Sequence, residues 1–400
     1  MAKAAIGMEI HQGAVVAVQL RQGRRGPVLG GYATEPLPPD AVTPSGVAKP
    51  AVLRQAVENA LQNAKAGRVN LCLAFAVDSM DARELRLPPM PEADTKAAIQ
   101  FELRQFFGGA AGGDDDRLLD FEFIQDLDRR DNHRPDDNVR NLLVVSVPRR
   151  KVYEYVTPLH EARIFPEIVD VGIFSLPFAV PRGGGVAYLH LGPGLTNFLV
   201  MQNGVYELSR QTELQLQLVL DNPHVVLATR AQAEAATVPG GYGAGGAAPA
   251  GAAGAGYATV ETGYGAAETG YGQAASGLEE AAAASETAAP EPGAAGGAEA
   301  LADTPAGRVL EQLMNWVSET LEFARVRRGA FTVEEAVQSI VISGPAAAVP
   351  GIAPLIEQRV GIQTSPAMPV IGDGSTSLPE DAAPVYALAV AMAHRGLTEL

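Results

Sequence analysis

In the first part of the chain, the spacing of hydrophobic and polar positions is typical first of strands, then of a helix, and then of a buried strand. Residues 4–33 alternate partly and contain a polar, glycine-bearing turn at 21–26, which predicts two strands around a turn. Residues 49–66 repeat apolar positions at helical spacing, and residues 69–77 are an unbroken apolar run, typical of a strand covered on both faces. The apolar face of this helix holds Val52, Ala56, Val57, Ala60 and Leu61.

The stretch from 78 to 147 carries a second group of elements. Its pattern predicts a strand near 81–90, a helix over 93–107, a strand at 120–127 and a buried strand at 142–148. Two polar loops, one rich in glycine and aspartate and one rich in charge, separate these elements. The apolar residues expected on one side of the helix are Ala97, Ala98, Phe101 and Phe106.

The second half of the chain repeats the opening pattern. Residues 186–210 predict a strand, a glycine turn, a strand, a hairpin turn at Asn203–Gly204 and another strand. A strand–turn–strand unit at the start of each half indicates a duplicated α/β fold with two lobes. The other predicted elements are a strand at 339–344 and helices over 149–162, 308–328, 351–361 and 383–397. The long helix places Val309, Leu310, Leu313, Val317, Thr320, Leu321 and Ala324 on one face.

Residues 230–302 have a different composition, dominated by alanine, glycine, glutamate, threonine and proline. With few large aliphatic side chains, the segment cannot bury enough apolar area to offset chain entropy, which predicts a disordered insertion. Three tyrosines recur every seven residues, but the glycines beside them disfavour a sustained helix. A spacer, a tyrosine-bearing tether and an expansion without consequence all stay open as its role.

The charge balance excludes two classes of partner. Of the 400 residues, 46 are acidic and 30 are basic, for a formal net charge of −16. A nucleic-acid partner would need clustered lysine and arginine, and docking on anionic lipid by charge alone would need the same. We therefore expect no nucleic-acid partner and, at most, indirect membrane contact.

The remaining composition favours a reducing compartment. The single cysteine, Cys72, lies in the apolar run 69–77 and is expected to be a small buried hydrophobic residue. Neither a stretch of eighteen apolar residues nor the apolar region of a signal peptide is present. The expected location is the cytoplasm, with any membrane attachment through a partner at the inner face of the cytoplasmic membrane.

Two segments together resemble a known family. The start AAIGMEIHQGAVVAVQLRQG (Ala4–Gly23) is followed by PPMPEADTKAAIQFELRQFF (Pro88–Phe107), in which Met90-Pro91 opens the helix. The order and spacing of these segments resemble the type IV pilus assembly protein PilM family, a branch of the actin-like ATPase superfamily. The ending ALAVAMAHRGL is similar to the end of that family's chains. The resemblance implies a duplicated actin-like (ribonuclease H-like) fold of two lobes with an inserted subdomain.

The resemblance also implies a division of the chain. Relatives carry a small lid subdomain between the second hairpin and the long helix, and this chain has the alanine- and glycine-rich stretch at that place. The expected parts are a first lobe at 1–77 and 148–184, an inserted subdomain at 78–147, a second lobe at 185–229 and 303–400, and a disordered insertion at 230–302.

In actin-like proteins three glycine-containing turns hold ATP between the lobes, and the first of these turns is altered here. The acidic position is kept as Glu9, but His11 stands where the family has the turn glycine, and Val16 stands where it has lysine. A ring near the phosphates and the loss of a positive charge both weaken phosphate binding. Gln12 and Gly13 complete this turn.

The second turn is altered more and the third less. His190 replaces the aspartate of the second turn, and Pro193 removes an amide donor. In the third turn Pro345 interrupts the glycine pair. We therefore expect a degenerate nucleotide site without a resident cofactor, with Mg-ATP kept as the alternative. The candidate residues for such a site are Glu9, Gln12, Gly13, Gly192, Gly194, Thr196 and Gly344.

Other catalytic or metal-binding chemistry is not indicated. The run Asp114-Asp115-Asp116 lacks the spacing of a calcium loop, and the six histidines are scattered. A lone histidine such as His190 is more often a satisfied core residue than a ligand. Trp316, within the long helix, is expected in the core. No catalytic residue and no metal ligand is assigned.

The function implied by the resemblance is a cytoplasmic scaffold of a type IV pilus or a related secretion or competence system. The family binds the short cytoplasmic N-terminal segment of a bitopic inner-membrane partner, a PilN-like protein, in a groove between the first lobe and the insert. The candidate groove residues are Phe101, Glu102, Phe106 and Phe107. An assembly ATPase, a platform protein and a second copy of the chain stay open as further partners.

Three alternatives remain at this stage. A nucleotide-switched assembly ATPase would need the altered turns to converge on Mg-ATP. The cytoplasmic half of a type II secretion platform shares the fold, but such chains usually continue into a membrane helix. An actin-like fold can also serve an unrelated function, because fold does not fix function.

Overall fold

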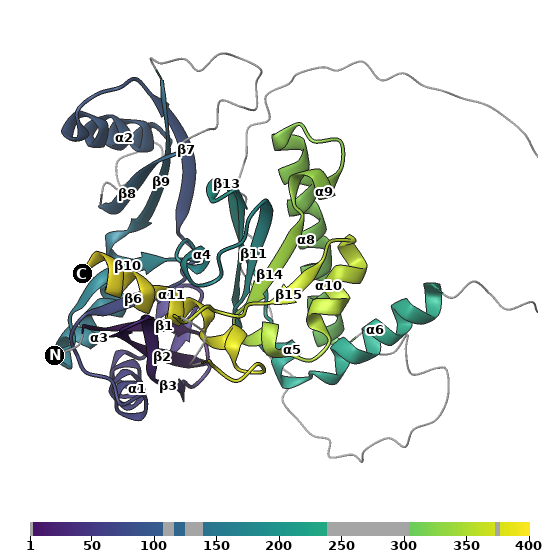
Figure 1. Cartoon of the computed structure of the whole chain (residues 1–400), viewed down its shortest axis with the longest axis horizontal. Coiled ribbons are helices and arrows are strands. Elements are labelled where there is room, and N and C mark those ends of the chain that lie inside the picture. The colour runs from purple at the N-terminus through teal and green to yellow at the C-terminus, as the bar shows by residue number, and fades with distance from the viewer. Residues whose placement is uncertain (1–2, 107–115, 125–138, 238–303, 373–376) are drawn as a thin grey trace, which may run out of the picture.

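The computed structural model describes residues 3–106, 116–124, 139–237, 304–372 and 377–400. These residues form two lobes, each built around a five-stranded mixed sheet, and Figure 1 shows the lobes side by side. Helices cover the sheets, so the predicted α/β, two-lobed actin-like arrangement is confirmed. The alanine- and glycine-rich stretch falls mostly at 238–303, outside the described residues, and so do Phe107, Asp114 and Asp115.

The first sheet has the order β10-β6-β1-β2-β3. Its strands are β1 (Ala4–His11), β2 (Ala14–Gly23), β3 (Gly26–Pro36), β6 (Leu71–Phe75) and β10 (Pro166–Val171). The opening unit has three strands where the sequence pattern predicted two, because the chain reverses at Gln12-Gly13 as well as near Gly26. Gly13 adopts a φ of +91°, which a residue without a Cβ reaches at no steric cost.

The second sheet has the order β13-β12-β11-β14-β15 and repeats the first. Its strands are β11 (Gly185–Leu191), β12 (Leu195–Gln202), β13 (Val205–Glu213), β14 (Ser339–Ser343) and β15 (Thr364–Pro366). In both sheets an antiparallel three-strand meander continues into two parallel strands. The predicted hairpin turn at Asn203–Gly204 is confirmed, since both residues have positive φ, as a type I′ turn requires.

The outer faces of the sheets are covered by amphipathic helices. On the first sheet these are α1 (Pro50–Asn63) and α3 (Arg149–Glu161), and the predicted apolar face of α1 is buried apart from the half-buried Val52. On the second sheet α8 (Pro305–Arg328) and α10 (Ile352–Val360) bury the same kind of stripe. Shorter elements complete this layer: α5 (Gln217–Asp221), α6 (His224–Thr237), α9 (Val333–Ala336) and the 3₁₀ turn η2 (Pro345–Ala348). Every residue predicted for the α8 face is buried, and Trp316 packs edge-on against Phe198.

The helix α11 (Ala383–Glu399) lies in the core between the two sheets. Its middle turns are apolar on all sides, as a fully buried helix requires. Gly7 allows the helix to approach β1 so closely that a Cβ added there would fall 1.8 Å from the carbonyl oxygen of Ala389. Cys72 lies under the same helix beside Gly396, and burial raises the pKa of its thiol to about 12. Its predicted role as a buried hydrophobic residue is confirmed.

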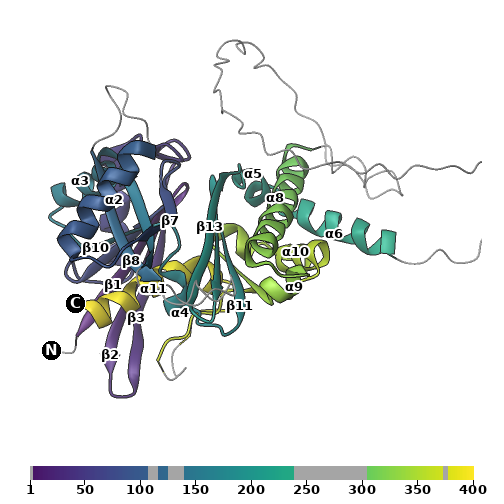
Figure 2. The ribbon, with the colours of Figure 1, turned by 90° about the horizontal axis from the view of Figure 1, so that it is seen from above.

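A smaller, three-stranded sheet is inserted into the first lobe. It has the order β7-β9-β8, with β7 (Asp81–Leu87), β8 (Arg117–Ile124) and β9 (Arg140–Pro148). The helix α2 (Glu92–Phe106) packs on one face of this sheet, as Figures 1 and 2 show. The buried side of α2 is formed by Thr95, Ile99 and Leu103, whereas Phe101 is 56% exposed.

Ala97 and Phe101, expected near one side of the helix, both lie on its exposed side, and Ala98 is half-buried. Ile99 and Leu103 are four residues apart and meet Leu142 and Val144 of β9, which fixes the rotation of the helix.

No helix within the described ranges is long and apolar enough to cross a membrane. The described residues also include three short elements, β4 (Val42–Thr43), β5 (Gly46–Val47) and α4 (Leu176–Ala179).

Candidate functional site

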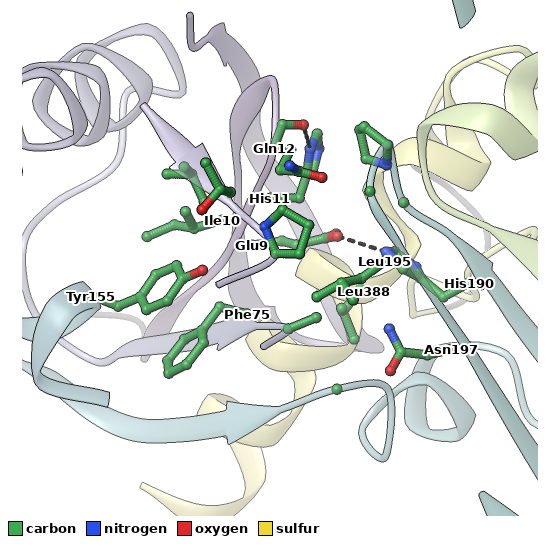
Figure 3. A pocket seen from close by; sticks show the side chains of 18 residues that line it. Glu9, Ile10, His11, Gln12, Phe75, Tyr155, His190, Leu195, Asn197 and Leu388 are labelled. Carbon is green, nitrogen blue, oxygen red and sulfur yellow. Dashed lines mark hydrogen bonds and ion pairs between the residues drawn. The ribbon is translucent and has the colours of Figure 1, made fainter. Parts of the chain in front are cut away.

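The tips of two β-hairpins, one from each lobe, meet at the cleft between the sheets. The first tip is the Gln12-Gly13 turn between β1 and β2, and the second is Gly192-Pro193-Gly194 between β11 and β12. The side chain of Gln12 lies directly against Gly194, because a Cβ added at Gly194 would fall 1.4 Å from Gln12 Oε1. The two tips that hold phosphates in nucleotide-binding members of this fold are thus in contact with each other (Figure 3).

A buried contact between a carboxyl group and a histidine ring joins the lobes behind these tips. His190 Nε2 lies 3.0 Å from Glu9 Oε1, and both side chains are almost completely buried. On the other side of the ring, His190 Nδ1 lies 3.1 Å from the hydroxyl of Ser343. The dashed line between Glu9 and His190 in Figure 3 marks the first of these contacts. The contacts of Glu9 with His190 and of His190 with Ser343 therefore link all three glycine-containing turns of the fold.

The charges of this site follow from its burial and its neighbours. Burial would raise the pKa of the Glu9 carboxyl, but His190 and His11 outweigh it and hold the pKa below its usual value. Burial lowers the pKa of the nearby His11 ring, and the attraction of Glu9 offsets this only in part. Glu9 is therefore ionised and His11 neutral near pH 7. The Glu9 carboxylate therefore has its closest partners within the protein, the rings of His190 and His11.

Little space remains inside the closed cleft. The cavity lined by Glu9, His11, Gln12, His190 and Asn197 has a volume of about 30 Å³. Pockets for small organic ligands usually measure about 300–1,000 Å³, whereas about 30 Å³ is the share of one water molecule in the liquid. This cavity is large enough for water and much smaller than the usual pocket for a small organic ligand.

Several buried polar atoms in and beside the cavity have no hydrogen-bond partner among the residues that the structure describes. They are Glu9 Oε2, His11 Nε2, Thr196 Oγ1 and both amide atoms of Asn197. Buried polar groups are normally paired with protein or ordered water, so a bound water is the occupant that fits their position and the cavity volume. Asn197, Tyr155 and Leu388 line the cavity although the sequence pattern did not single them out. Asn197 is directly opposite His190 in the β11–β12 register, which a correct hairpin alignment could have found.

The structure brings the predicted nucleotide-site residues close together but gives them internal partners. Glu9, Gln12, Gly192 and Gly194 line the cavity. Thr196 is fully buried behind it, and Gly13 lies at the outer tip, near Gln217. Gly344 adopts a φ of +88°, and its N–H donates to the carbonyl oxygen of Pro384 at 2.9 Å, so that amide is already used. Within the described part of the chain, no group of three or more metal-binding side chains is found.

A second, larger hollow lies between the inserted sheet and the first lobe, and we call it the insert groove. Its volume is about 460 Å³. One wall is the face of β8 and β9 that is turned away from α2, and the other is formed by β10, α4 and the last turns of α11. The lining residues used below are Asp120, Glu122, Leu143, Val145, Val169, Asp170, Phe174, Ser175, Phe178, Arg395 and Glu399.

The groove candidates taken from the sequence lie elsewhere. Phe101 and Glu102 are on α2, which covers the opposite face of the inserted sheet, and neither lines the insert groove. Phe106 ends α2, and Phe107 lies outside the described residues. The lining residues were not recognisable from the sequence, because the groove exists only where β8 and β9 meet β10 and α11.

Two sheets of the same topology, with three glycine-containing turns converging between them, define an actin-like protein. Residues 7–206 match the family model described as type IV pilus assembly protein PilM. The chain therefore belongs to the PilM family of type IV pilus assembly proteins. No curated protein matches it in sequence.

Comparison with solved structures supports the fold. The chain is similar to a structure described as a PilM–PilN type IV pilus biogenesis complex, with 17% identity over 98% of both chains and a TM-score of 0.64. It also matches the ethanolamine utilization protein EutJ from Carboxydothermus hydrogenoformans, with 10% identity, 98% and 90% coverage and a TM-score of 0.42. A ROK hexokinase from Thermus thermophilus matches with 12% identity over the whole of both chains and a TM-score of 0.36.

Proposed function

We propose that this chain is a scaffold in the inner-membrane assembly platform of a type IV pilus or a related secretion or competence system. It docks the cytoplasmic N-terminal segment of a bitopic, PilN-like membrane protein in the insert groove. It works at the cytoplasmic face of the membrane and is held there by that partner. Residues 78–147 act as the inserted subdomain that forms one wall of the groove.

The closed cleft is the observation that carries the scaffold assignment. A switch that binds ATP needs room for the nucleotide and free groups to hold it. Here the cavity is about 30 Å³, Gln12 lies against Gly194, and Glu9 is paired with His190. We therefore propose that the nucleotide site has degenerated and that the cleft stabilises the lobes.

The insert groove has the properties of a peptide-docking site. Both β8 and β10 are terminal strands of their sheets among the described residues, so each presents backbone groups to a further strand. Between them lie the side chains of Val169 and Phe178, which are 38% and 58% exposed. The solved complex of a related fold contains a PilM and a PilN, which agrees with docking of such a partner.

Titration with nucleotide tests the closed cleft. Isothermal titration of Mg-ATP into the purified protein is expected to give no binding heat up to about 1 mM, because losing several charge-assisted phosphate contacts costs several powers of ten in affinity. The same sample should show no shift of its thermal midpoint with Mg-ATP. Micromolar binding that Glu9→Gln abolishes would contradict the proposal and favour a nucleotide-switched assembly ATPase.

Two equally exposed phenylalanines test the docking site. Phe178 lines the insert groove, and Phe101 is on the far side of the inserted sheet with nearly the same exposure, 58% against 56%. We expect Phe178→Ala to weaken binding of a synthetic peptide of the PilN-like partner's N-terminal segment about tenfold, and Phe101→Ala to leave the dissociation constant unchanged. Fluorescence anisotropy of a labelled peptide measures both. A loss confined to Phe101→Ala would move the docking site to α2.

A further inference from the structure

The insert groove combines apolar walls with negative charge. Successive side chains of a strand point to opposite faces, so Asp120 and Glu122 of β8 share a face of the inserted sheet. In the register of the sheet, Asp120 is opposite Val145 and Glu122 is opposite Leu143. Both Val145 and Leu143 line the groove, which places the two carboxylates at the outer edge of an apolar surface. Both acidic side chains are exposed.

The positive charge in the groove is already neutralised. The Arg395 guanidinium lies 3.2 Å from Asp170 Oδ2 and donates to Ser175 Oγ at 3.1 Å. The same side chain bonds both oxygens of Glu399, at 2.8 and 3.0 Å. Arg395 is therefore used by groups of the protein on both sides. Among the described lining residues, four carboxylates stand against this one guanidinium, which leaves the open part of the groove negative.

The opposite wall supplies the apolar contacts. Val169 of β10 and Phe174 and Phe178 around α4 face the strip formed by Leu143 and Val145. An extended chain laid along a terminal strand alternates its side chains between two directions. It can thus place apolar residues between these walls while the residues in between reach the edge carrying Asp120 and Glu122.

We propose that the insert groove selects a cationic, extended peptide, in which lysine or arginine side chains meet Asp120 and Glu122 and apolar side chains fill the space near Val169 and Phe178. This inference rests on the proposed docking function and specifies its ligand. The cytoplasmic flanks of a membrane-spanning helix carry an excess of lysine and arginine, so a short segment next to such a helix has the required charge. Opposite charge across an interface also speeds the encounter and excludes acidic competitors.

The test measures peptide affinity at two salt concentrations. The probe is the synthetic N-terminal segment of the PilN-like partner, and a second version has each lysine and arginine replaced by glutamine. We expect the first peptide to bind about fivefold more weakly at 500 mM than at 50 mM NaCl, because salt screens exposed charge pairs. The double variant Asp120→Asn/Glu122→Gln should weaken binding about fivefold at low salt and remove the salt dependence. The glutamine peptide should bind wild type and the double variant equally.

A matched variant controls for overall charge. Glu92→Gln/Asp94→Asn removes the same two charges from the start of α2, on the other side of the inserted sheet, and should leave both the affinity and its salt dependence unchanged. Equal effects of the two double variants would overturn the inference. Binding that is sensitive to Phe178→Ala but not to salt or to Asp120→Asn/Glu122→Gln would overturn it and leave peptide docking standing. Absence of binding by either peptide at both salt concentrations would overturn both proposals.

Discussion

Replacing Gly7 by alanine is expected to destabilise the protein by about 3 kcal/mol or more. The added Cβ would fall 1.8 Å from the carbonyl oxygen of Ala389 and 2.5 Å from the amide nitrogen of Ala393. Both atoms belong to the backbone of α11, which is buried on all sides and cannot move away without opening the core between the sheets. Urea unfolding followed by circular dichroism measures the change.

A second glycine serves as the control for this substitution. Gly67 follows α1 and has nothing within 4 Å of an added Cβ, so Gly67→Ala should leave the unfolding midpoint nearly unchanged. A similar midpoint for the two variants would show that α11 does not press on β1 as described, and the account of the core would then be incorrect.

Replacing Glu9 by alanine is expected to cost about 3–5 kcal/mol of stability, the usual result of removing one partner from a buried, hydrogen-bonded pair of ionisable side chains. His190 would lose the carboxylate 3.0 Å from its Nε2 and remain buried between the lobes. His190→Ala should cost a similar amount. The double variant should cost less than the sum of the two, because the pair can be lost only once. Chemical unfolding of the four proteins gives this coupling energy.

The stability change expected for Glu9→Ala has the opposite sign to the change expected for a residue that serves only to bind a ligand. Acidic residues placed to hold a metal ion usually destabilise the protein in the absence of that ion, so their removal tends to stabilise it. Glu92→Ala is the control for a general effect of losing an acid, since Glu92 pairs with Lys96 at the surface, and it should barely move the midpoint. Unchanged or increased stability in Glu9→Ala would point back to a ligand site in the cleft.

The elements with strong periodicity were predictable from the sequence. The buried face of α8 follows directly from its apolar spacing, and β6 follows from its unbroken apolar run. The rotation of α2 was not predictable, because Phe101 is more hydrophobic than its surroundings yet is left exposed once Ile99 and Leu103 meet β9. Local spacing gives a helix an apolar side, whereas tertiary contacts decide which of two candidate sides is buried.

The residues of the candidate site were predictable from the sequence, but the contacts between them were not. The sequence identified Glu9 as the retained acid of one turn and His190 as a substitution in another, more than 180 residues apart. That the substituted histidine pairs with the retained acid depends on how the lobes pack, which the sequence of one chain does not state. The family resemblance implied a groove between the first lobe and the insert, but its lining residues were missed for the same reason, since its walls come from strands and a helix far apart in the chain.

The helix α11 connects the two hollows of the molecule. Its first turn receives the N–H of Gly344 from the second lobe, its middle lines the cleft at Leu388, and its last turns give Arg395 and Glu399 to the insert groove. Gly7 and Gly396 leave no room between the helix and the first sheet, so α11 is held firmly against β1 and β6. The helix that closes the core between the two sheets is therefore also a wall of the insert groove. Under the docking function proposed above, a bound partner would rest directly on the core of the protein.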